Sequence, residues 1–274
     1  MKLKTTLLAL LTCLCVNVFA KDATCSMIVP FAAGGGGDIN ARVLQKGNKN
    51  IVIEYKPGAF AAAAVNHINN NPDSFMLAPL VMFGADNPNK DVNVDVLRVM
   101  YGIDLVIVSN REMSVDDLVD KKLNIGIPYV GTTQHIIALQ FANKNKQMEL
   151  IPMGGDTKAL PALVSKDLDA YITNTVVAKQ WIKNYPQFHS VVEIPFDKKV
   201  FTHGITLENY LFQGIIISKF ANKEQKQKIE ECIDTATSAP EFKQEIANLN
   251  IKVVNSDATK VTAEYHKLRK KYGF

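Results

Sequence analysis

The stretch "SMIVPFAAGGGGDINARVLQ", residues 26–45, is the most informative part of this chain for its fold. It passes from an apolar run that ends at Phe31, through the four consecutive glycines of 34–37, into a helical pattern that begins near Asp38. A glycine-rich turn of this kind lies at the carboxyl end of a strand, where open α/β sheets bind ligands. Unpaired N–H groups at the helix start attract anions, and glycine lets a ligand approach the backbone. The stretch therefore predicts an α/β fold with an anion-binding loop.

Two nucleotide-binding motifs are excluded at this loop. A P-loop needs Gly-Lys-Ser/Thr after its glycines, but Gly37 is followed by Asp38 and Ile39. A dinucleotide-binding fingerprint needs its third glycine at position 39 or 40, where Ile39 and Asn40 stand. A tight turn in which the glycines serve packing alone remains the alternative.

The first residues have the three parts of a secretory signal peptide. Lys2 and Lys4 supply the positive charge, residues 5–16 the apolar segment and residues 18–20 the small-residue cleavage site. We therefore expect cleavage after residues 1–20 and a location in the periplasm. Removal of the two lysines takes the formal net charge from +4 to +2, so we expect no nucleic acid as a partner.

The rest of the chain alternates apolar runs with helix-like segments in two series, from "CSMIVPF" to "DSFMLAPLVMF" and from "LRVMYGIDLVIVSN" to "SVVEIPF". This alternation predicts mainly parallel sheets covered by helices. We expect two lobes, one of residues 21–102 plus 217–274 and one of residues 103–216. A cleft between such lobes is a common place for a small-molecule site. The pattern also predicts a closing helix in "DATKVTAEYHKLRKKYG", capped by Ser256 or Asp257.

Two of the four cysteines leave with the signal peptide, so Cys25 and Cys232 remain in an oxidising compartment. They form either one disulfide or two separate buried thiols, and we favour the disulfide because an exposed periplasmic thiol is a liability. The histidines have no Cys or acidic partner at metal-ligand spacing, so we predict no metal and no cofactor.

The opening stretch is similar to the N-terminal motif of the Bug-type receptors, the periplasmic solute-binding proteins of tripartite tricarboxylate transporters. The family pattern V-P-F-x-x-G-G-x-x-D-x-x-A-R is matched by Val29, Pro30, Phe31, Gly34, Gly35, Asp38, Ala41 and Arg42. Two later segments also resemble the family: "IVIEYKPGAFAAAAV", and "IGIPYVGTTQHIIALQF" with its Gly-Thr-Thr-x-His run at 131–135. The resemblance covers nearly all of the mature chain.

The resemblance implies a two-lobed class II periplasmic binding protein, a Venus flytrap, that closes on a small organic carboxylate. The carboxylate is held, partly through ordered waters, between the loop 31–38 and the facing loop 130–135. The resemblance also implies that the receptor delivers its ligand to the inner-membrane permease subunits of the transporter and is not an enzyme. We expect a monomer. The alternatives are a sensory receptor and, less favoured because no Gly-x-Ser-x-Gly elbow is present, a secreted α/β hydrolase.

The two facing loops and one strand end supply the predicted ligand-binding residues. This set is Phe31, Ala33, Gly34, Gly35, Gly36, Thr132, Thr133, His135, Thr173 and Asn174. We expect backbone N–H groups from the glycine loop and a hydroxyl from one of the threonines, while the other caps the following helix. Packing is an equal alternative for His135, as turn formation is for Thr173 and Asn174. Asp38 is expected to cap its helix, because its charge would repel a ligand carboxylate.

Departures from the family pattern predict the character of the pocket. Met153 and Gly154 stand where an aromatic residue and a cation are common, and Phe60 replaces a glycine. We therefore expect Phe60, Phe83 and Met153 to form an apolar part of the pocket wall. Thr173 stands where relatives often have Asp, so we disfavour a ligand with a cationic amino group.

Overall fold

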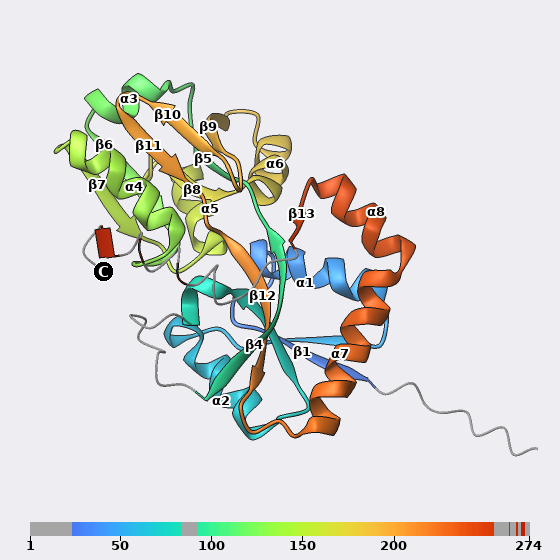
Figure 1. Ribbon diagram of the computed structural model, residues 1–274. Helices are drawn as coiled ribbons and strands as arrows, with labels where there is room; N and C mark the ends of the chain where they lie inside the picture. The colour runs from blue at the N-terminus through green and yellow to red at the C-terminus, as the bar shows by residue number, and fades with distance from the viewer. Residues whose placement is uncertain (1–23, 84–92, 255–262, 264–266, 268–269, 272–274) are drawn as a thin grey trace, which may run out of the picture.

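The computed structural model describes residues 24–83, 93–254, 263, 267, 270 and 271. The predicted signal peptide and most of the predicted closing helix, with its expected cap, lie outside the described residues. Within them, no helix has the length and apolar character needed to cross a membrane. Figure 1 shows two bodies, each built around its own sheet, with β4 and β12 running from one towards the other.

The first body, called here the six-stranded half, holds a sheet of order β13-β4-β12-β3-β1-β2. Its strands are β1 (Cys25–Val29), β2 (Ile51–Tyr55), β3 (Phe75–Pro79), β4 (Val94–Gly102), β12 (Phe212–Ser218) and β13 (Lys252–Val253). Its helices are α1 (Gly36–Gly47), α2 (Ala62–Asn70), α7 (Lys223–Ser238) and α8 (Pro240–Leu249), with short 3-10 turns η1 (Ala59–Ala61) and η2 (Leu80–Phe83).

The second body, the five-stranded half, holds a sheet of order β7-β6-β8-β5-β9. Its strands are β5 (Leu105–Ser109), β6 (Leu123–Ile127), β7 (Met148–Pro152), β8 (Ala170–Asn174) and β9 (His189–Ile194). Its helices are α3 (Val115–Asp120), α4 (Thr133–Lys144), α5 (Asp156–Ser165) and α6 (Thr175–Asn184). The sequence did not predict the hairpin β10 (Lys199–Thr202) and β11 (Ile205–Glu208), which buries Ile205 and Leu207 in the core of this half.

The expectation of mainly parallel sheets is wrong in part, because both sheets are mixed. The trios β2-β1-β3 and β7-β6-β8 are parallel as predicted. The strands β12 and β4, and likewise β5 with β8 and β9, pair antiparallel. The reason for the first pair is the path of the chain: β4 carries it out of the six-stranded half and β12 carries it back, so these neighbours run in opposite directions.

The same path bears on the predicted lobe boundaries. The strand β12 pairs with β4 along its whole length, so its first residue, Phe212, already belongs to the six-stranded sheet. We therefore still propose two lobes, one of residues 21–102 plus a C-terminal segment and one that starts at residue 103. We place the start of the C-terminal segment before residue 212 instead of at 217.

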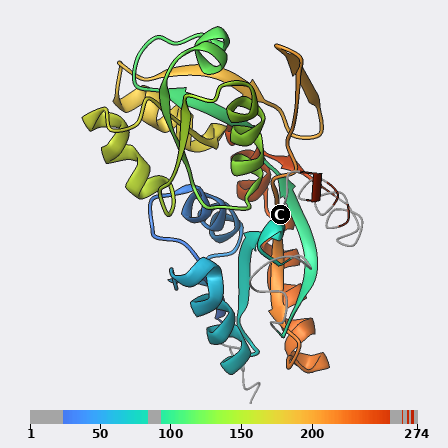
Figure 2. The same cartoon turned by 90° about the vertical axis from the view of Figure 1, so that its left-hand side faces the viewer.

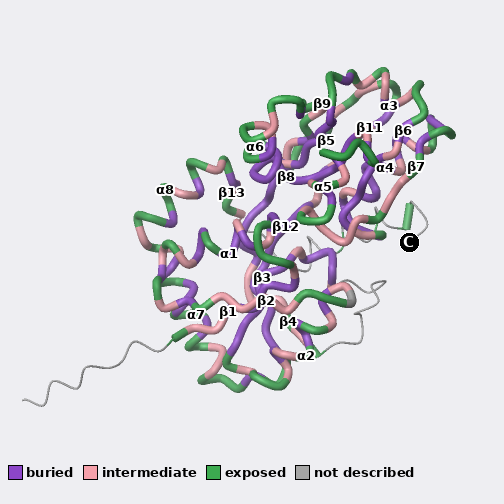
Figure 3. The backbone as a smooth tube through the Cα atoms, turned by 180° about the vertical axis from the view of Figure 1, so that it is seen from behind, coloured by how far each residue is buried: buried purple, intermediate pink, exposed green. Residues whose placement is uncertain are grey.

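The strand that leads to the glycine loop is buried on both faces. Met27 and Val29 pack with Leu44 of α1 in one core, whereas Ile28 packs with Ile68 of α2 in the other. Strands covered by helices on both faces carry continuous apolar runs, which explains the unbroken run before the loop. Figure 3 shows this buried centre as a purple path through the sheet. The glycine loop thus begins from a rigid position.

The predicted disulfide is confirmed: Cys25 and Cys232 are bonded, with their Cα atoms 6.5 Å apart. The side-chain amide of Asn48 donates to the carbonyl of Cys232 at 3.2 Å beside it. The bond ties the first residue of β1 to α7, at the end of the strand opposite the glycine loop.

Candidate functional site

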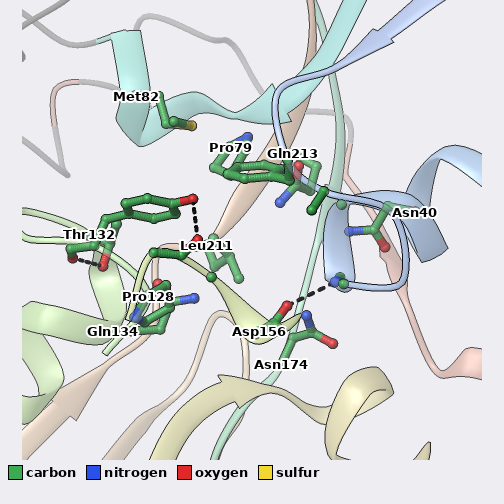
Figure 4. Close-up of a pocket in the computed structure, with 18 of the residues that line it drawn as sticks. Asn40, Pro79, Met82, Pro128, Thr132, Gln134, Asp156, Asn174, Leu211 and Gln213 are labelled. Atoms are coloured by element: carbon green, nitrogen blue, oxygen red, sulfur yellow. Dashed lines mark hydrogen bonds between the residues drawn. The ribbon is translucent and has the colours of Figure 1, made fainter. Parts of the chain in front are cut away.

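A cavity of about 80 Å³ lies where the two halves meet (Figure 4). The six-stranded half contributes the glycine loop, Asn40, the end of β3 and Gln213, while the five-stranded half contributes the starts of α4, α5 and α6. A single ordered water needs about 10 to 15 Å³ of such space. The cavity therefore has room for a ligand of a few non-hydrogen atoms. Figure 2 shows how the glycine loop and α1 lie below the five-stranded half.

The glycine loop is held by its own helix. The helix α1 begins at Gly36 with Gly35 as its cap, so the prediction that Asp38 is the cap is wrong. Asp38 lies inside the first turn, and its Oδ2 accepts from the N–H of Gly34 at 2.8 Å. A glycine cap has no side chain with which to bind the helix, so the next carboxylate along the turn fixes the loop instead.

Asp38 is itself anchored away from the cavity. Its Oδ1 accepts from the hydroxyl of Tyr55 at 2.7 Å and from Nε of Arg42 at 2.7 Å. Burial, followed by the hydrogen bond to Asp38, raises the pKa of Tyr55 above its ordinary value, so the phenol stays a donor. Asp38 therefore organises the loop from behind.

Two of the backbone donors expected for a ligand are occupied by carboxylates of the protein. The N–H of Gly34 donates to Asp38, and the N–H of Gly36 donates to Oδ2 of Asp156 at 2.9 Å. No acceptor among the described residues takes the N–H groups of Gly37 and Asp38. The first N–H groups of a helix lack intrahelical partners and favour negative charge, so these two N–H groups remain available to an acceptor at the start of α1.

The facing loop is built around the start of α4. Thr132 caps this helix by accepting from the N–H of His135 at 3.3 Å, and its hydroxyl donates to the carbonyl of Tyr129 at 2.8 Å. The Nδ1 of His135 accepts from the N–H of Gly131 at 3.0 Å. Burial lowers the pKa of His135 to about 4, which keeps the ring neutral and able to accept at neutral pH. His135 therefore shapes the loop.

Asp156, the first residue of α5, bridges the two halves and was not predicted as a site residue. Its Oδ1 accepts from the hydroxyls of Thr173 at 2.9 Å and Tyr171 at 3.2 Å, both on β8. Its Oδ2 accepts from Gly36 of the six-stranded half. Figure 4 shows this side chain reaching towards the loop. The sequence did show Asp156 in the segment that departs from the family pattern, but not its contacts.

Asn174 is a second contact between the halves. It caps α6 by accepting from the N–H of Val177 at 2.9 Å, and its amide nitrogen lies against the glycine loop. A Cβ atom placed on Gly36 would be 2.2 Å from this nitrogen. The absence of a side chain at position 36 is therefore required by the facing half, and tight packing of the loop alone does not account for this glycine.

The apolar wall differs from the prediction. Phe60, Phe83 and Met153 do not line the cavity; Pro79, Val81, Met82 and Leu211 do. The ring of Phe60 instead packs edge-on against Tyr129, with 5.7 Å between ring centroids, and Met153 packs against the core beside β8. The chain turns at η2 directly after β3, so Val81 and Met82 come to the cavity and pack on Ile136 of the facing half.

Half of the predicted binding residues line the cavity: Phe31, Gly35, Gly36, Thr132 and Asn174. The others, Ala33, Gly34, Thr133, His135 and Thr173, do not line it. Gly37, Asn40, Tyr129, Gln134, Asp156 and Gln213 line it without having been predicted. The described residues contain no cluster of three His, Cys, Asp or Glu suited to a metal ion.

No protein-family model matches this chain, and no curated protein sequence matches it. Solved structures do match. The periplasmic binding protein BugD has a TM-score of 0.70 and 18% identity, over 91% of this chain and 95% of BugD. MatC from Rhodopseudomonas palustris, solved with bound malate, has a TM-score of 0.70 and 17% identity, over 91% of this chain and 97% of MatC.

A third match is R. palustris Rpa4515, solved with adipate, with a TM-score of 0.72 and 12% identity over 91% of this chain and 95% of that chain. At such identities the likeness shows the fold. The chain thus has the α/β fold of the periplasmic binding proteins. BugD is one of the Bug-type receptors, whose N-terminal motif the glycine loop of this chain resembles.

Proposed function

We propose that this protein is an extracytoplasmic solute receptor of the Bug type, which binds a small organic carboxylate between its two halves. In this proposal, the mature chain resides in the periplasm and delivers its ligand to the inner-membrane permease subunits of a tripartite tricarboxylate transporter. It makes and breaks no bond.

The observation that supports this proposal most strongly is the cavity between the halves, which meets the start of α1. The N–H groups at the start of α1, among which that of Gly37 belongs to a residue lining the cavity, supply fixed dipoles for a carboxylate there. Asn40, Gln134 and Gln213 supply neutral polar groups around them, and a ligand that leaves such groups unpaired binds less tightly. The bound malate of MatC and the adipate of Rpa4515 agree with a carboxylate ligand in this fold.

A thermal-shift screen of the mature chain tests the proposal. The panel contains mono-, di- and tricarboxylates, amino acids and neutral compounds of similar size. A ligand at a hundred times its dissociation constant stabilises the folded protein by about 2.7 kcal/mol. For a chain of this length we expect the melting temperature to rise by about 5 to 10 °C. Stabilisation by neutral compounds alone would contradict carboxylate binding.

The two alternatives are separated by further readouts from the same protein. Turnover of a bound acid or ester would support a hydrolase. A closed form that binds a receptor kinase instead of permease subunits would support a sensory role, with the same cleft and the same ligand.

A further inference from the structure

Asp156 is the one acidic or basic side chain among the residues that line the cavity. Of those lining residues, none is Lys, Arg or His, so within the described part of the chain the full charge at the cavity is negative. This is unexpected for a site proposed to hold a carboxylate, because two carboxylates at close range repel each other. The lone carboxylate therefore restricts the charge of the ligand.

The position of Asp156 is fixed by neutral donors from both halves. These donors are the N–H of Gly36 and the hydroxyls of Tyr171 and Thr173. A carboxylate offers about four acceptor positions, so about one remains for a ligand. The ion pairs among the described residues do not include Asp156, so its charge is hydrogen-bonded without being neutralised.

The two phenols beside Asp156 add no charge of their own. Burial, and then the charge of Asp156, raises the pKa of Tyr171 well above its ordinary value and that of Tyr129 above its ordinary value. Both groups remain neutral, so neither adds a second negative charge. A partly buried charge with no counter-charge is costly, and a cation placed beside it recovers part of that cost.

We propose that Asp156 is a specificity-determining residue, which selects carboxylates that also carry an ammonium group and disfavours di- and tricarboxylates. The inference rests on the proposed function, since it names the class of ligand for the same cleft. The ligand's carboxylate lies at the start of α1, and its ammonium group donates to Asp156. This reverses our expectation from Thr173, because the hydroxyl of Thr173 donates to a carboxylate that the preceding helix, α5, supplies.

Four probes that share the propionate frame test the selection by charge. Propionate is the parent acid, alanine and β-alanine add an ammonium group, and succinate adds a second carboxylate. Dissociation constants are measured by calorimetry for the wild type and for Asp156→Asn, which keeps the shape of the side chain and removes its charge. We expect the wild type to bind at least one of the two amino acids more tightly than propionate and succinate.

In Asp156→Asn the ratio of succinate affinity to amino acid affinity should rise at least tenfold. Asp234→Asn is the matched control, because Asp234 is exposed, pairs with Arg98 and lies outside the cavity. It removes one negative charge from the surface and should leave the ratio unchanged.

Thr173→Val provides a second variant that acts through Asp156. It removes one donor to Oδ1 of Asp156. The ratio of succinate affinity to amino acid affinity should therefore change in the wild-type background but not in Asp156→Asn, where the charge is already absent. An unchanged ratio in Asp156→Asn, with carboxylates still bound, would overturn the proposed role of Asp156 and leave the proposed function standing. If no carboxylate of any charge binds either protein, the proposed function falls together with it.

Discussion

Replacement of Gly36 by alanine is expected to weaken binding of the ligand roughly ten- to a hundredfold while the empty protein remains as stable as the wild type. The new Cβ atom would lie 2.2 Å from Nδ2 of Asn174, so the halves cannot close fully. Asn174 cannot easily turn away, because its Oδ1 caps α6. Overpacking costs about 1 to 3 kcal/mol, and each 1.4 kcal/mol is a tenfold change in affinity.

We expect ligand-free Gly36→Ala to be as stable as the ligand-free wild type, because position 36 lies in α1, where alanine is favoured over glycine. Calorimetric titration and thermal melting measure the two effects. Gly37→Ala is the contrasting variant, since its Cβ would be 2.5 Å from the ring of Phe31 in the same half, and it should destabilise the loop itself. Asn174→Ser, which keeps a capping hydroxyl, should restore binding to Gly36→Ala. Wild-type affinity in Gly36→Ala would refute closure at this contact.

Loss of the Cys25–Cys232 disulfide is expected to lower the free energy of unfolding by about 4 kcal/mol, because the bond closes a very long loop of the unfolded chain. For a chain of this length that corresponds to a fall of about 10 °C in melting temperature. The double variant Cys25→Ala with Cys232→Ala, melted beside the reduced and oxidised wild type, measures the effect.

Ligand affinity should change little in the cysteine variant. The disulfide lies at the opposite end of β1 from the glycine loop, a distance of about 13 to 17 Å for a five-residue strand. Reducing agent should lower the melting temperature of the wild type and leave that of the double variant unchanged. Two free thiols in the mass of the unreduced mature protein would show that the bond does not form.

Much of the fold could be predicted because the sequence carries it in local patterns. The unbroken apolar run before the glycine loop predicts β1, and the Cys25 and Cys232 pair predicts a bond between distant segments. The mixed pairing of β4 and β12 could not be predicted in the same way. It depends on the direction in which the chain crosses between the halves, which no short pattern records.

The site, too, has parts that local sequence patterns predict and parts that depend on distant contacts. The glycine loop and the cap at Thr132 are visible as motifs, because glycine and threonine have position-specific backbone roles. The contact of Asp156 with Gly36 joins residues 120 positions apart. Such a contact exists only once the halves meet, so the sequence alone predicts no more than an aspartate at the start of a helix. The same holds for Val81 and Met82, which the turn after β3 carries to the cavity.

We propose above all that a carboxylate binds at the start of α1 between the two halves. The most direct measurement is the backbone amide NMR spectrum of the mature protein while the best carboxylate from the screen is added. We expect the amide signals of Gly36, Gly37 and Asp38 to shift most, together with those of Thr132 and Gln134 in the facing half. Saturable binding that leaves these signals in place would contradict this proposal.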